Sequence, residues 1–128
     1  MIRPVEEVKE DIRLAREFAD EIREIAQAEN KPVREVAPYY GAIWLTDEGV
    51  KTAFIGDSNS LVRRVDQLID IVEALYDAFP ELERVTSYAR AETLSRLRSH
   101  DDLVRLREAG LKRVHVGLET GDAELLKY

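Results

Sequence analysis

The chain has 128 residues, 45% of them hydrophobic, a size that suits one domain, residues 1–128, around a single core. Its 19 lysines and arginines against 26 acids give a net charge of −7, which disfavours nucleic acid and anionic membranes as partners. The absence of cysteine excludes disulfides, thiol nucleophiles and cysteine-ligated clusters from the chemistry of this chain alone. The charged first residues and the lack of a long apolar run predict a cytoplasmic protein.

A long amphipathic helix is predicted from Pro4 to about Asn30. Proline suits a first helical position, and apolar residues recur on one stripe from Val5 to Ile25. Phe18 widens the apolar face, which suits packing on a sheet.

Residues 33–50 predict a short helix or an irregular cover, because Pro38 and Gly41 interrupt the pattern. We interpret Tyr39, Tyr40 and Trp44 as packing residues rather than a stacking site.

Residues 52–55 form a compact apolar run that predicts a parallel strand covered on both faces. Gly56 follows, and Asp57, Ser58 or Ser60 are expected to cap the next helix, whose apolar spacing runs from 61 to 79. Polar groups at the carboxyl end of a parallel strand are where α/β proteins bind ligands, so this turn is the first candidate site.

Two further strands are predicted at residues 84–88 and 113–118, with a small helix near 93–97 between them. Ser99 and Asp102 make a capping box for a helix that Gly110 ends. Asp122 is expected to cap one more helix.

Successive strands start about thirty residues apart, which is the period of a βαβ unit. Because such crossovers are right-handed, the three strands should be parallel and their carboxyl ends should share one edge. The polar residues expected on that edge are Asp57, Ser58, Asn59, Ser87, Tyr88, Arg90, Glu119 and Thr120.

With these turns in place, the chain resembles the first half of the partial (β/α) barrel of radical S-adenosylmethionine enzymes. The resemblance rests on FIGDSNSLVRRVDQLIDIVEAL, RVTSYARAETLSRL and SHDDLVRLREAGLKRVHVGLETGDAELLKY, and covers most of the chain except 26–49, which looks like an insertion. It implies an α/β fold, a TIM-barrel-like fragment of about three parallel strands with flanking helices.

The resemblance also implies roles for individual residues in binding S-adenosylmethionine. Gly56, Asp57 and Ser58 stand where the family receives the amino group of the methionine moiety. Ser87 and Arg90 stand where it contacts the methionine carboxylate or the sugar, and Glu119 where it accepts hydrogen bonds from the ribose hydroxyls.

One departure from the family concerns the [4Fe-4S] cluster. The three-cysteine loop that ligates it in the family would precede the first helix, and this chain has no cysteine. We therefore expect a fragment of such an enzyme that is inactive alone, with no catalytic residue of its own.

Two alternatives remain open. Three parallel strands with open edges predict a structural module that associates with itself or is completed by another chain. A metal-dependent α/β enzyme using Asp57 and Glu119 is the other. His115 is interpreted as a hydrogen-bonded core residue and His100 as solvent-facing, with neither binding a metal.

Overall fold

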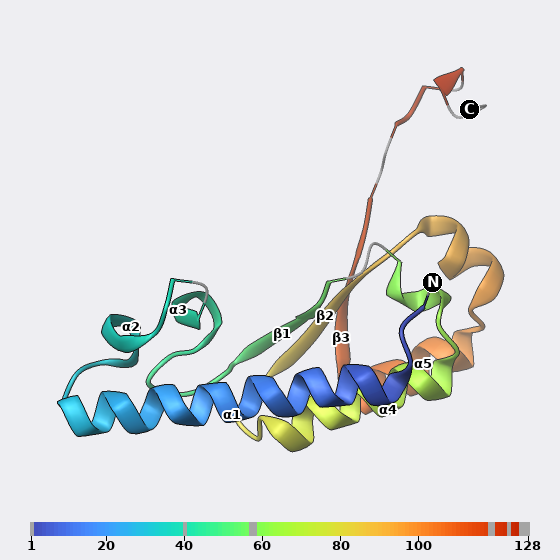
Figure 1. Cartoon of the computed structure of the whole chain (residues 1–128). Coiled ribbons are helices and arrows are strands. Elements are labelled where there is room, and N and C mark those ends of the chain that lie inside the picture. Colours follow the sequence, from blue (N-terminus) through green and yellow to red (C-terminus); the bar gives the residue numbers. More distant parts are fainter. Residues whose placement is uncertain (1, 40, 57–58, 118–119, 123, 126–128) are drawn as a thin grey trace.

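The computed structural model describes residues 2–39, 41–56, 59–117, 120–122, 124 and 125 (Figure 1). Its elements in chain order are α1 (Val5–Glu29), α2 (Val33–Val36), α3 (Gly41–Trp44), β1 (Thr52–Ile55), the 3₁₀ turn η1 (Ser60–Val62), α4 (Val65–Ala78), β2 (Arg84–Ala89), the π-helical turn η2 (Thr93–Leu97), α5 (His100–Ala109) and β3 (Leu111–Val116). The protein is therefore an α/β fold, as the sequence predicts.

The three strands form one parallel sheet in the order β1-β2-β3. Ile55, the last residue of β1, pairs with Ser87 on β2, and Val116, the last residue of β3, pairs with Ala89. The carboxyl ends of all three strands consequently lie at the same edge of the sheet, which confirms the parallel arrangement predicted from the βαβ period.

The helices α1, α4 and α5 lie together along one side of the sheet (Figure 1). The residues of β2 that face them are Val85, Ser87 and Ala89, and all three are buried. Thr86, on the other face, is also buried, at 6% exposed, whereas Tyr88 on that face is exposed. Val85 and Ala89 join the apolar faces of α1 and α4 in one core, whose helical members include Ala19, Ile22, Leu68 and Val72.

No helix of the described residues lies over the opposite face of the sheet, and Thr52 and Phe54 of β1 are exposed there, so the prediction that β1 is covered on both faces is wrong. Thr52 and Phe54 alternate with the half-buried Ala53 and Ile55 and point to the open side. A run of apolar residues shows that a strand is hydrophobic, but it does not show how many of its faces are covered. Phe54 belongs to the apolar run and lies on the uncovered face.

The residues between α1 and β1 lie over the C-terminal part of α1 (Figure 1). Val33 and Leu45 from this segment are buried in the common core, and the Val33 N–H donates to the Asp47 carboxylate at 2.7 Å. The segment contains the two short helices α2 and α3, in agreement with the expected short helix or irregular cover.

The predicted end signals of α5 are confirmed. Ser99 Oγ accepts a hydrogen bond from the Asp102 N–H, and the Asp102 carboxylate accepts one from the Ser99 N–H, both at 3.1 Å. Gly110 ends the helix with φ +113°, a conformation that favours glycine.

Of two other predicted helix caps, the structure contradicts the one at Ser60 and agrees with the one at Asp122. The expected cap from Ser60 is wrong, because η1 intervenes and α4 begins only after Arg64. Asp122 does accept hydrogen bonds from the N–H groups of Glu124 and Leu125, at 2.8 and 3.2 Å, as a cap would.

Glu81, in the loop between α4 and β2, connects three parts of the fold. Its carboxylate accepts a hydrogen bond from the Arg23 guanidinium on α1 at 2.7 Å and one from the Val50 N–H at 3.0 Å. Gly49, at φ +105°, allows this approach, since a Cβ there would lie 2.2 Å from the Glu81 carboxylate. Burial alone would raise the pKa of Glu81, but hydrogen bonds from Arg23 and from backbone N–H groups, with the charge of Arg23, lower it from 4.5 to about 2.

Replacing Glu81 by Gln should destabilise the fold at pH 7 by roughly 2 kcal/mol, because the charged hydrogen bonds to Arg23 and Val50 are lost. Since the folded-state pKa is depressed, the stabilisation is complete above the ordinary carboxyl pKa and disappears as the pH falls toward about 2. Urea unfolding at several pH values should therefore show the difference between the two proteins shrinking between about pH 4.5 and pH 2. Glu83→Gln, at an exposed carboxylate 3.7 Å from Lys51, is the matched control and should change little.

Candidate functional site

The carboxyl edge of the sheet is open to solvent at its first turn. Gly56 follows β1 and is exposed, and a Cβ placed on it would have no atom within 4 Å. Arg90 follows β2 and is also exposed, and its guanidinium forms no ion pair within the part of the chain that the structure describes. The edge thus offers open space beside Gly56 and, among the described residues, a guanidinium without an ion pair at Arg90.

Asn59 holds two of the edge turns together. Its side-chain oxygen accepts a hydrogen bond from the Arg90 N–H at 3.1 Å, and its side-chain nitrogen donates one to Thr93 Oγ1 at 2.8 Å. Thr93 is buried, so this bridge links the segment after β1 to the segment after β2 from the protein side. The sequence places Asn59 on the edge, but its spacing gives no sign of this bracing role.

Of the residues predicted to bind a cofactor, Gly56 and Arg90 lie on this open edge. Ser87 is fully buried among the residues facing the helices, and its hydroxyl donates to the Tyr88 carbonyl at 3.3 Å. Asp57, Ser58 and Glu119 lie outside the described residues.

The two predicted residues on this edge have groups that suit the charged ends of an amino acid, whereas the chain offers no ligand of the usual kind for an iron-sulfur cluster. A backbone carbonyl suits an ammonium group, and a guanidinium suits a carboxylate. A [4Fe-4S] cluster of the usual kind needs cysteine thiolates, and the chain has none. Within the described residues, no group of three or more His, Asp or Glu side chains could hold a metal ion.

A second group of polar side chains lies on the open face of the sheet. Alternate residues of the strands project there: Thr52, Arg84, Thr86, Arg113 and His115, with the aromatic rings of Phe54 and Tyr88. The period-two alternation in RVTSY and RVH could have revealed this group, whereas the search for polar residues at strand ends did not.

His115 is exposed on this face, so its interpretation as a core histidine is wrong. Its ring lies 6.1 Å from that of Phe54 and 5.8 Å from that of Tyr88, centroid to centroid. The apolar residues on either side of His115 predict a strand correctly, but they do not show which face of it is covered. His100, on α5, is exposed as expected.

Comparison of the chain with protein-family models, with curated proteins and with solved structures finds no match. Among the described residues, no helix combines the length and apolarity needed to cross a membrane.

Replacing Asn59 by Ala should destabilise the protein by about 1 to 2 kcal/mol, because the Arg90 N–H and the buried Thr93 hydroxyl lose their partner. Amide hydrogen exchange should become faster at Arg90 in particular. Gln27→Ala, at an exposed position of α1, should leave both the unfolding free energy and the Arg90 exchange rate unchanged. Equal exchange at Arg90 in all three proteins would show that Asn59 does not brace the edge.

Proposed function

We propose that the chain forms part of a radical S-adenosylmethionine type of (β/α) barrel and binds S-adenosylmethionine at the carboxyl edge of its sheet. The observation that carries the proposal is the strand order β1-β2-β3 with the helices on one face. Sequential parallel strands with helices on one side are the arrangement of a barrel, whereas a doubly wound sheet reverses its order and has helices on both sides.

In this proposal, each residue at the edge binds a different part of the cofactor. The backbone of Gly56, with Asp57 and Ser58, receives the methionine ammonium group, and the guanidinium of Arg90 receives the methionine carboxylate. Glu119 accepts hydrogen bonds from the ribose hydroxyls. Because Ser87 is fully buried, the proposal assigns it no direct contact.

The proposed activity of this chain is binding. Without cysteine it supplies no ligand of the usual kind to the cluster that reduces S-adenosylmethionine in the family, so any radical chemistry would need ligands from elsewhere. We also propose a cytoplasmic location, on the ground of the charged first residues and the lack of a long apolar run.

Calorimetric titration with S-adenosylmethionine tests the proposal. Arg90→Gln should weaken binding roughly tenfold, because a charge-assisted hydrogen bond to the carboxylate is lost. Glu119→Ala should weaken it as well. Arg107→Gln removes the same charge from the exposed surface of α5 and is the control. Absence of heat with the folded wild-type protein would refute the proposal.

A structural module that associates with itself is the second candidate, and exposed aromatic surface favours it. Phe54 and Tyr88 are 48% and 47% exposed on the open face, with their rings 4.8 Å apart, and no helix in the described part of the chain covers them. Both β1 and β3 are edge strands with unpaired backbone groups on their outer sides.

Sedimentation velocity over a range of protein concentrations tests this candidate. Self-association through the aromatic pair predicts a shift from monomer to oligomer that Tyr88→Ser moves to higher concentration. Tyr39→Ser, at an exposed tyrosine before α3, is the control. A wild-type monomer at every concentration would exclude the candidate.

A further inference from the structure

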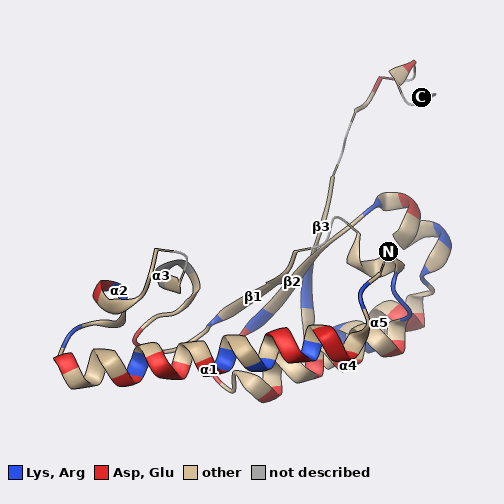
Figure 2. Ribbon diagram, viewed as in Figure 1, with Lys and Arg blue, Asp and Glu red and all other residues tan. Residues whose placement is uncertain are grey.

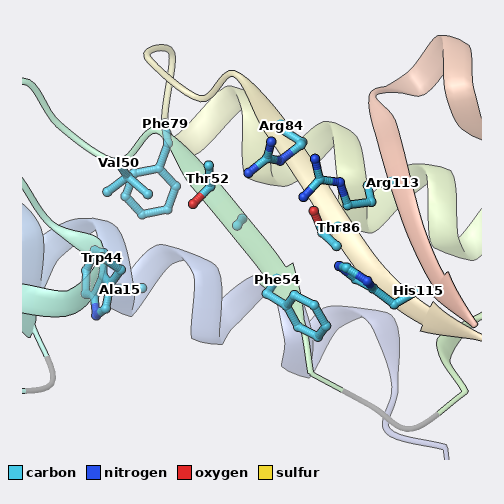
Figure 3. Close-up of a pocket in the computed structure, with 11 residues that line it drawn as sticks. Ala15, Trp44, Val50, Thr52, Phe54, Phe79, Arg84, Thr86, Arg113 and His115 are labelled. Atoms are coloured by element: carbon cyan, nitrogen blue, oxygen red, sulfur yellow. The ribbon is translucent and has the colours of Figure 1, made fainter. Parts of the chain in front are cut away.

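A pocket of about 520 Å³ borders β1 and opens on the uncovered face of the sheet (Figure 3). Its polar side is formed by Thr52, Arg84, Thr86, Arg113 and His115, and its apolar side includes Trp44, Val50, Phe54 and Phe79. The volume is that of a site for a small organic molecule.

The two arginines of the pocket differ from the arginines that pair with acids elsewhere in the chain. Ion pairs with carboxylates are formed by Arg3, Arg13, Arg16, Arg23, Arg64, Arg96 and Arg105. Arg84 and Arg113 form none within the described residues, and no acidic side chain lines the pocket. Figure 2 shows acidic residues along α1 and α4 and only basic ones on the strands.

The unpaired state of Arg84 has an energetic consequence. Its Nε atom is buried and has no hydrogen-bond partner in the described structure. A buried donor without a partner is destabilising, and buried donors in native proteins are nearly always satisfied. An acceptor that enters the pocket would satisfy it.

The strand register gathers the donors into one group. Thr52 pairs with Arg84 across β1 and β2, and Thr86 pairs with Arg113 across β2 and β3. Figure 3 shows both guanidinium groups on the same side of the sheet, near Thr86. Two guanidinium groups and two hydroxyls are suitable donors for an oxyanion, and repulsion between the two cations disfavours the empty site.

We propose that this pocket binds a small molecule with a carboxylate or phosphate group on an apolar or aromatic body. Arg84, Arg113 and the threonines bind the anionic group, while Trp44 and Phe79 contact the body. This site is distinct from the carboxyl edge, because Arg84 begins β2 and Arg90 follows its end, roughly 20 Å along the strand. The inference therefore does not depend on binding of S-adenosylmethionine.

The rival occupant is an acidic surface of a second copy of the chain. The pocket favours a small molecule, because it is a concavity of limited volume with an apolar wall. Acids on the outer side of α1 are in part already paired within the helix, as Glu10 and Glu17 are with Arg13.

Titration followed by ¹⁵N NMR tests the proposal with phenyl phosphate, phenylacetate and the neutral 2-phenylethanol as probes. At least one anionic probe should bind, shifting amide signals of β2 and β3, and the alcohol should bind roughly tenfold more weakly. The stronger of the two anions identifies the group that the pocket prefers. Equal binding of the alcohol, or no binding of either anion, would overturn the proposal.

Arg113→Gln should weaken the anionic probe at least tenfold. Arg113 is exposed, so this variant should fold, whereas Arg84→Gln requires a check of its melting temperature. Arg107→Gln is the matched control and should bind like wild type. An unchanged affinity in Arg113→Gln would refute the site, as would a dimer in which the pocket residues are protected from exchange by the second copy. Arg90→Gln should not affect these probes, so failure here is distinguishable from failure of the S-adenosylmethionine proposal.

Discussion

The handedness of the β-strand, helix, β-strand crossover is the constraint on which this structure depends. With the strands in the order β1-β2-β3, right-handed crossovers place α4 and α5 on the same side of the sheet, where α1 also packs. The same constraint leaves the opposite face without cover and collects the carboxyl ends at one edge. Both candidate sites therefore arise from the topology before any particular side chain is considered.

Much of the fold could be predicted from the sequence because its signals are local. The capping box of Ser99 and Asp102, the end of α5 at Gly110 and the run of residues in β1 each depend on neighbours in the chain. Apart from the helix cap expected at Ser60, the mistakes concern which face of a strand is covered. Phe54 and His115 lie in apolar strands and yet point to the open side, because the number of layers that cover a sheet is a tertiary property.

The candidate sites were also predictable to different degrees, because strand ends are local signals and the covered face of a strand is not. The edge location of Gly56 and Arg90 follows from the strand ends. Ser87 and Thr86 point to opposite faces of β2 and are both buried, at 0% and 6% exposed, so the alternation in the sequence does not predict the burial of Ser87. The net charge of the chain gives no sign of the basic pocket. A chain of net charge −7 still concentrates Arg84 and Arg113 on one face, while Glu81, through the Val50 N–H, helps to fix the wall beside them.

The composition of the open face bears on what covers it. A parallel sheet that is packed by protein on both sides has aliphatic residues at nearly every position. Here the open face presents Thr52, Arg84, Thr86, Arg113 and His115, and its aromatic residues Phe54 and Tyr88 lie together. Dry packing over the two arginines would bury unpaired charge, which is strongly unfavourable. The aromatic pair can serve as a protein contact, whereas the basic half of the face suits an anion, and a small oxyanion meets the two arginines of the pocket without desolvating a second protein surface.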